Sequence, residues 1–174
     1  MKPRHRILIV DDESFVRDSL VDLLEAEGYA TSAASGKDEA LKILETEHVS
    51  VIVTDLRMPG GDGISLLQEA RKKDVEAPVI LLTGVGTVPE AVEAMRSGAH
   101  DFIQKPVESK EFVVLIRRAI EHLELVSEVK YLRTAVRGLQ GPGEIVGSSR
   151  AMAAVRALAA QVAPADATVL IRGE

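Results

Sequence analysis

The segment that decides the fold lies at residues 49–63 and reads V-S-V-I-V-T-D-L-R-M-P-G-G-D-G. Its first six residues form a nearly continuous apolar run, which is typical of a buried strand in a parallel sheet. Asp55 follows directly where this strand should end. A turn rich in glycine and proline then leads into a helical pattern. The segment therefore predicts a carboxylate at the carboxyl end of a buried strand.

Four similar runs flank this strand and alternate with amphipathic stretches of helical period. Five repeats of strand then helix predict right-handed crossovers, and therefore an α/β fold with a doubly wound five-stranded parallel sheet. The first helix should carry Phe15, Leu20 and Leu24 on one apolar face and end at Gly28. The predicted strands are Arg6–Val10, Ala30–Ala34, Val49–Thr54, Pro78–Leu82 and Asp101–Gln104. The predicted helices are Ser14–Glu27, Gly36–Glu47, Gly63–Lys73, Thr87–Ser97 and a stretch from Ser109 onward.

The composition excludes several classes of protein. With 46% hydrophobic and 28% charged residues, the chain is ordinary for a soluble globular protein. A net charge of -6 and 3% aromatic residues argue against nucleic-acid binding by this chain, because a phosphate backbone favours basic surfaces. The absence of cysteine removes disulfides and thiolate zinc sites. Since no apolar stretch could cross a bilayer and no signal peptide is recognisable, we expect no membrane contact and a cytoplasmic location.

Polar and charged residues follow four of the predicted strands. In a parallel sheet of this kind the functional site forms outside the carboxyl ends of the strands, so these side chains should converge. Three neighbouring carboxylates repel one another unless a cation lies among them, and oxygen ligands alone favour Mg²⁺, with Mn²⁺ as an alternative, over zinc. The residues concerned are Asp11 and Asp12 after the first strand, Asp55 after the third, Thr83 after the fourth and Lys105 after the fifth.

Such a set is suited to phosphoryl transfer. One carboxylate can act as a nucleophile toward a phosphoryl donor and form an acyl phosphate. Lys105 would neutralise the transferred group and the Thr83 hydroxyl would sense it. Each residue also has an ordinary interpretation, since Asp11 or Asp12 could cap a helix, Thr83 could simply end a strand and Lys105 could be a solvated lysine. Their joint occurrence at the ends of four strands favours a shared site.

The motifs I-L-I-V-D-D-E, V-T-D-L-R-M-P-G-x-D-G, L-L-T-G and D-F-I-Q-K-P resemble the receiver domain of two-component response regulators. The resemblance covers about residues 4–122 and implies a flavodoxin-like receiver fold. It also implies that Asp55 is the phosphoacceptor, and that Thr83 and Lys105 contact the phosphoryl group. Phe102 matches the aromatic switch position of the family. The implied metal ligands are Asp11, Asp12, Asp55 and the backbone carbonyl of Arg57.

The last receiver helix should be long, because residues 109–137 contain neither glycine nor proline. At 1.5 Å per residue, this helix would reach roughly 40 Å. Apolar residues in its second half step by four, three and four, which is the narrow seam that pairs two helices. The alternative is a helix packed only on its own domain. Glycine and proline at 138–143 then indicate a linker. The predicted dimer seam consists of Leu125, Val129, Leu132 and Val136.

The remaining segment resembles a second family domain. The runs G-E-I-V-G-S-S-R-A-M and T-V-L-I-R-G-E are similar to the opening of the AAA+ ATPase domain of NtrC-type, sigma-N-dependent transcriptional activators. Residues 84–102 are similar to the dicarboxylate-transport branch of that family. The resemblance implies that residues 144–174 are the start of a truncated AAA+ domain, with Gly173 and Glu174 in a partial phosphate loop. Since the Walker A Gly-Lys, Walker B and helix-turn-helix are absent, we expect neither ATP hydrolysis nor promoter binding, and no enzyme.

The expected function is that of a response regulator phosphorylated on Asp55 by a sensor histidine kinase with Mg²⁺. Phosphorylation would control homodimerisation, through the linker helix and the face of the last helix, and a downstream sigma-N-dependent AAA+ domain. RNA polymerase with sigma-N and DNA would be partners only through the missing domains. The alternative is a stand-alone signalling receiver without transcriptional output.

Two other classes fit the residues less well. A haloacid-dehalogenase-type phosphatase needs a second aspartate two residues after the nucleophile, where this chain has Arg57. A flavodoxin-like FMN module needs a phosphate loop rich in hydroxyl groups and glycine after the first strand, where residues 11–13 are all acidic. The four histidines lie far apart in the sequence without ligand spacing, so they are expected to be ordinary residues.

Overall fold

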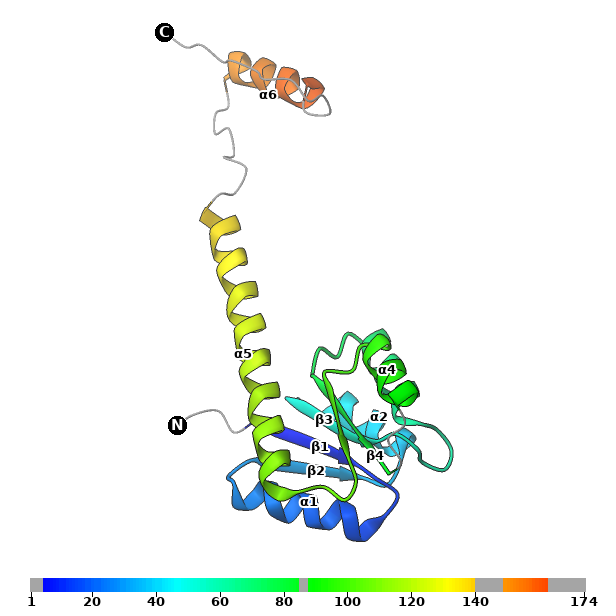
Figure 1. Cartoon of the computed structure of the whole chain (residues 1–174). Helices are drawn as coiled ribbons and strands as arrows, with labels where there is room; N and C mark the ends of the chain where they lie inside the picture. Colours follow the sequence, from blue (N-terminus) through cyan, green and yellow to red (C-terminus); the bar gives the residue numbers. More distant parts are fainter. Residues whose placement is uncertain (1–4, 85–87, 140–148, 163–174) are drawn as a thin grey trace. The chain divides into compact units, whose positions relative to one another are not determined.

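The computed structural model describes residues 5–84, 88–139 and 149–162 (Figure 1). Strands and helices alternate through the first of the two compact units into which the chain divides, Met1–Glu128 and Val129–Glu174. The strands are β1 (Arg6–Val10), β2 (Ala30–Ala34), β3 (Val51–Asp55), β4 (Val79–Thr83) and β5 (Asp101–Gln104). The helices are α1 (Ser14–Ala26), α2 (Lys37–Thr46), α3 (Gly63–Lys72), α4 (Val88–Arg96), α5 (Ser109–Leu139) and α6 (Arg150–Val162).

The five strands form one sheet with the order β2-β1-β3-β4-β5, and every neighbouring pair is parallel. This is the doubly wound sheet predicted from the alternating pattern. Strands β1 and β3 lie inside the sheet, and all five residues of β3 are buried. Because both faces of these strands are covered, their sequences read as continuous apolar runs rather than as an alternation of apolar and polar residues.

Successive side chains of the central strands point to opposite faces and enter two separate cores. On one face, Leu8 and Ile52 pack with Leu66 of α3. On the other face, Ile7 and Val51 belong to the same cluster as side chains of α1 and α5. The latter are Leu20, Leu24, Phe112, Ile116 and Ala119. The helices packed on the two faces thus fix the positions of the strands, and therefore of the residues at the strand ends where the site forms.

The predicted boundaries differ from the observed ones by at most two residues, which is within the usual spread at element ends. Strands β3 and β4 each extend one residue further than predicted, so Asp55 and Thr83 are the last residues of their strands. Gly28 ends the first helical segment with a φ of +89°, as predicted. The expectation for Phe15 was wrong, because this side chain in the first turn of α1 is 84% exposed rather than packed with Leu20 and Leu24.

Helix α5 is continuous from Ser109 to Leu139 and runs two residues into the range predicted as a linker. Its first half is anchored, since Phe112 and Ile116 are completely buried. In its second half, Leu125 is 61%, Val129 45% and Leu132 52% exposed. The side chain of Val136 lies outside the described residues, as do 140–148 and 163–174, including Gly173 and Glu174. None of the described helices is long and apolar enough to cross a membrane.

Candidate functional site

The residues predicted to converge are gathered at the carboxyl edge of the sheet. Asp11 follows β1, Asp55 and Thr83 end β3 and β4, and Lys105 follows β5. Backbone hydrogen bonds fix these ends against one another: the amide of Leu56 donates to the carbonyl of Leu82, and that of Lys105 to the carbonyl of Thr83, both at 2.8 Å. Parallel pairing therefore brings together side chains that lie up to 94 residues apart in the sequence (105 minus 11).

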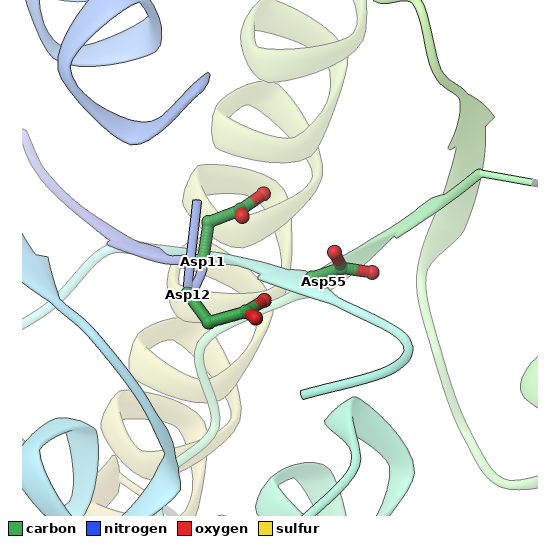
Figure 2. Close-up of side chains that lie close together, drawn as sticks. All are labelled: Asp11, Asp12 and Asp55. Carbon is green, nitrogen blue, oxygen red and sulfur yellow. The ribbon is translucent and has the colours of Figure 1, made fainter. Parts of the chain in front are cut away.

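Three carboxylates form the acidic part of this site (Figure 2). Asp11, Asp12 and Asp55 each offer one oxygen, and these three oxygens lie within 4.8 Å of one another. Asp11 is completely buried and Asp55 is 7% exposed, whereas Asp12 is exposed. Burial raises the pKa of the Asp11 carboxyl, although the Lys105 ammonium and the backbone amide of Glu13 act in the opposite direction. The protein thus holds together negative charges that would repel one another without a cation.

The donor set fits a hard divalent cation. Octahedral Mg²⁺ binds oxygen at about 2.0–2.1 Å, so ligand oxygens around one ion must lie within roughly 4 Å of one another, close to the observed spacing. One oxygen of Asp11, Oδ2, is also buried and lies 2.8 Å from the Lys105 ammonium. A buried carboxylate oxygen is favourable only if positive charge nearby compensates for its lost hydration.

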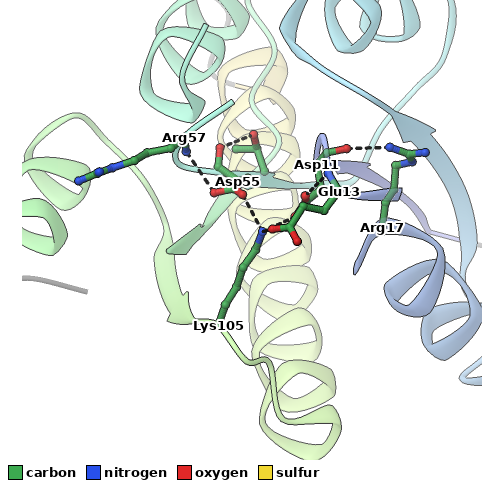
Figure 3. Close-up of polar contacts among 7 residues, drawn as sticks. Asp11, Glu13, Arg17, Asp55, Arg57 and Lys105 are labelled. Carbon is green, nitrogen blue, oxygen red and sulfur yellow. Dashed lines mark hydrogen bonds and ion pairs between the residues drawn. The ribbon is translucent and has the colours of Figure 1, made fainter. Parts of the chain in front are cut away.

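Lys105 supplies one such charge (Figure 3). Its Nζ lies 2.6 Å from Asp55 Oδ2, 2.8 Å from Asp11 Oδ2 and 3.4 Å from Glu13 Oε1. Partial burial acts to lower the pKa of Lys105, but its contacts with Asp11 and Asp55 outweigh this and raise the pKa above its ordinary value. The side chain therefore remains an ammonium ion through the neutral pH range and can meet an incoming anion.

Backbone groups orient the acidic residues. The amide of Glu13 donates to Asp11 Oδ1 at 2.9 Å, and the amide of Arg57 donates to Asp55 Oδ1 at 3.1 Å. Arg17, one turn into α1, donates from Nη1 to the backbone carbonyl of Asp11 at 2.8 Å. These contacts, drawn in Figure 3, fix the end of β1 and the start of the loop after β3. Both carboxylates are thereby held in place before any ligand binds.

A cavity of about 160 Å³ opens beside these groups and is lined by Asp55, Thr83 and Lys105 among others. Thr83 is 6% exposed, so its hydroxyl belongs to the interior of the site. Two other predicted residues lie less deeply, since the Arg57 side chain is exposed and Phe102, on β5, is 37% exposed. No role was predicted from the sequence for Glu13 or Arg17. The position of Glu13 directly after the aspartate pair was the one signal for it.

The family of response regulator receiver domains matches residues 7–117, so the chain belongs to this family. It is homologous to the N-terminal part of NtrC-family activators, which confirms the resemblance of the motifs. It is 34% identical to the C4-dicarboxylate transport transcriptional regulatory protein DctD of Rhizobium meliloti over 97% of this chain and 36% of that protein. It is 37% identical to the regulatory protein AtoC of Escherichia coli over 98% of this chain and 37% of that protein.

Solved structures support the same assignment. A receiver domain protein from Clostridium thermocellum, 34% identical, superposes with a TM-score of 0.66 over 70% of this chain and 98% of that one. NtrX of Brucella abortus in complex with ADP, also 34% identical, gives a TM-score of 0.71 over 93% of this chain and 35% of that protein. The chain therefore spans little more than a third of the length of the curated activators that it matches.

Proposed function

We propose that the chain is the phosphorylation-controlled receiver of an NtrC-type regulator, in which Asp55 accepts a phosphoryl group from the phosphohistidine of a sensor histidine kinase. The observation that carries this proposal is the position of Asp55: its carboxylate lies at a cavity and is contacted at 2.6 Å by Lys105. Two further carboxylates, Asp11 and Asp12, lie beside it. A nucleophile next to a fixed ammonium ion and a cation site is the arrangement that phosphoryl transfer requires.

The transfer step involves few bonds. An Asp55 carboxylate oxygen attacks phosphorus, an O–P bond forms and the P–N bond of the donor breaks. Its electron pair returns to the imidazole nitrogen of the kinase, which takes up a proton. Lys105 neutralises charge on the transferred group, and the Thr83 hydroxyl donates a hydrogen bond to one of its oxygens. The resulting acyl phosphate remains in the cavity that Asp55, Thr83 and Lys105 line.

Asp11, Asp12, Asp55 and the backbone carbonyl of Arg57 would hold Mg²⁺, with Mn²⁺ as an alternative. The burial of Asp11 and the approach of the three carboxylate oxygens to within 4.8 Å of one another support this assignment. When bound, the ion supplies positive charge to the carboxylates and to the phosphoryl oxygens. Asp11 and Asp55 are already fixed by the backbone amides of Glu13 and Arg57, so binding of the ion requires little rearrangement.

The new group would be sensed through β4 and β5. Thr83 ends β4, and Phe102 lies on the neighbouring strand, where it pairs with Leu81 two residues before Thr83. A phosphoryl group on Asp55 draws the Thr83 hydroxyl inward, and Phe102, which is 37% exposed, turns into the space that is freed. This is a population shift between two packings of one element, biased by local charge.

The output would act through α5. We infer a division into a receiver at 4–122, an extended α5 that pairs two copies, a linker and the start of an AAA+ domain from residue 144. The exposed Leu125, Val129 and Leu132 recur at seam spacing and support helix pairing. The DctD relatives are named as transcriptional regulatory proteins, which supports control of transcription. We also propose that the controlled domain is a sigma-N-dependent activator and that the protein acts in the cytoplasm. A stand-alone receiver remains the rival function.

Phosphorylation of Asp55 is tested by mass spectrometry. The protein is treated with a small acyl phosphate and Mg²⁺, and we expect a mass gain of one phosphoryl group that disappears with a chelator. Asp55→Ala should abolish the gain completely. Asp22→Ala, which removes an exposed carboxylate of α1 outside the site, should label like the wild type. Full labelling of the Asp55 variant would remove this residue from its role.

The pairing of α5 is tested by analytical ultracentrifugation with and without the acyl phosphate. Leu132→Lys places a charge on the proposed seam and should yield monomers, whereas Tyr131→Lys changes its exposed neighbour and should leave the association constant nearly unchanged. A wild-type protein that stays strictly monomeric under both conditions would favour the stand-alone receiver.

A further inference from the structure

A fourth carboxylate, that of Glu13, lies at the mouth of the site but outside the acidic triad. Its side chain is 64% exposed, and its Oε1 lies 3.4 Å from Lys105 Nζ. It lines the same cavity as Asp55 and Thr83. In Figure 3 the Glu13 side chain points toward the Lys105 ammonium from the side of β1 and α1. An incoming phosphoryl group would therefore meet this negative charge as well as the positive one.

The local backbone does not account for the direction of this side chain. Glu13 is the N-cap residue of α1, but unlike the Ser, Thr, Asp or Asn that commonly occupies this position, it makes no side-chain hydrogen bond to the helix. The backbone of Glu13 is nevertheless well fixed, because its amide donates to Asp11 Oδ1 and its carbonyl accepts from the Arg17 amide at 3.0 Å. The carboxylate is thus directed to Lys105, 92 residues away in the sequence, and not to its own helix.

Lys105 has one positive charge and three carboxylate partners. Two of these partners, Asp11 and Asp55, are the residues that the proposed function assigns to the metal and to the phosphoryl group. Glu13 is the partner with no other assigned task. We propose that Glu13 tunes the rate of phosphorylation: its carboxylate competes with the incoming phosphoryl group for the Lys105 ammonium, and this discriminates against highly anionic small donors. The inference rests on the proposed function of Asp55.

The size of the effect follows from the exposure of the pair. An ion pair with one partner in water contributes little, which corresponds to a rate factor of about two to five. Because the Glu13 carboxylate is solvated, added salt should screen its interactions with Lys105 and with the donor. The Debye length is roughly 10 Å at 0.1 M ionic strength. A donor with less negative charge should also be less affected. These two dependences distinguish electrostatic competition from a merely structural role.

The experiment compares Glu13→Gln with the wild type and with Asp22→Asn, which changes the net charge equally on the same side of the sheet. Pseudo-first-order rate constants for the mass gain are measured with acetyl phosphate and with the less anionic phosphoramidate, at saturating Mg²⁺. We expect Glu13→Gln to react about two to five times faster with acetyl phosphate at low salt. The gain should shrink with phosphoramidate and at about 0.5 M salt, and Asp22→Asn should match the wild type.

Three results would overturn the inference. These are equal rates for Glu13→Gln and the wild type, an increase that does not depend on salt, and a loss of Mg²⁺ affinity in calorimetric titration, which would make Glu13 a metal ligand. Because Glu13 is exposed, the variant should melt within a degree or so of the wild type, roughly as exposed substitutions do. If the wild type itself gains no mass, the proposed role of Asp55 fails. If only the Glu13 comparison fails, that role stands.

Discussion

The carboxyl ends of the strands form one edge of the sheet and the amino ends form the opposite edge. These two edges carry different kinds of side chain. At the carboxyl edge, Asp11, Asp55 and Lys105 are largely buried charges that depend on one another. At the amino edge the strands are preceded by partly buried polar side chains, including His5 before β1 and His100 before β5. Parallel topology brings equivalent ends together in both cases. The reactive site therefore forms where charged side chains are buried together, whereas the opposite edge serves to hold α5.

The amino edge anchors α5. His5 Nε2 lies 3.2 Å from Glu124 Oε1, and its Nδ1 lies 3.3 Å from the Ser50 hydroxyl. The rings of His100 and His122 are 5.0 Å apart between centroids. His48 lines a cavity there with Leu123 and Ser127 of α5. His5, His48 and His100 therefore contact or face the part of α5 that lies next to the exposed seam, and His122 belongs to it.

The largest expected effect concerns the packing beneath the carboxyl edge. A Cβ atom on Gly63 would lie 2.5 Å from the backbone oxygen of Asp55 and 2.8 Å from Leu81 Cδ2. We expect Gly63→Ala to lower the free energy of unfolding by about 2–3 kcal/mol and to slow phosphorylation, because the strand end must shift. Urea denaturation and the mass assay measure the two effects. Gly36→Ala is the control, since nothing lies within 4 Å of its Cβ position, and it should cost about 0.5 kcal/mol or less.

A second prediction tests whether the carboxyl edge depends on cations. Lys105→Met leaves Asp11 and Asp55 without their ammonium partner, so the free energy of unfolding without Mg²⁺ should fall on the order of 1–2 kcal/mol. Added Mg²⁺ should stabilise this variant more than the wild type, which thermal melts at several Mg²⁺ concentrations can measure. Lys37→Met, which removes an ion pair with Glu69 and touches none of the three aspartates by an ion pair, should show no extra response to Mg²⁺. Equal responses would contradict a shared cation site.

The smallest expected effect belongs to the amino edge. Burial, assisted by His122 and opposed by Asp101, lowers the pKa of His100 below its ordinary value of 6.5. The unfolded chain therefore binds a proton more readily, so stability should be full above pH 6.5 and decline as the pH falls through the lower, folded-state pKa. Because His100 is only half-buried, the loss should be roughly 0.5 kcal/mol or less. His100→Gln should flatten this part of the profile in chemical denaturation between pH 7 and 5, whereas an unchanged slope would assign it to other groups.

Much of the carboxyl edge could be predicted because local patterns determine it. Short predicted strands followed by Asp11, Asp55 and Lys105 imply a parallel sheet, and the topology of such a sheet brings those ends together. The turn at Gly28 was equally readable, since its positive φ favours glycine. The prediction for Phe15 was wrong because helical periodicity indicates which face of a helix is apolar. It does not indicate how far along the helix the sheet covers that face.

The contacts that were not predicted depend on distant packing. Glu13 meets Lys105 only because β5 joins the sheet 92 residues later. The histidines show no spacing in the sequence, yet His100 and His122 face each other because α5 crosses the amino edge after β5. Such side-chain directions are set by packing between distant segments. The sequence pattern of one segment therefore cannot predict them.

Strand β5 is outermost in the sheet and pairs only with β4. It is also the last strand in the sequence, so the site is completed last when the chain is synthesised. A chain synthesised from its amino end acquires Asp11, Asp12 and Asp55 long before it acquires Lys105. Until the last strand docks, the clustered acids lack their ammonium ion and the cavity lacks a wall. Under the proposed function, a nascent chain that lacks β5 could not accept a phosphoryl group as the complete domain does, because Lys105 is missing from the site.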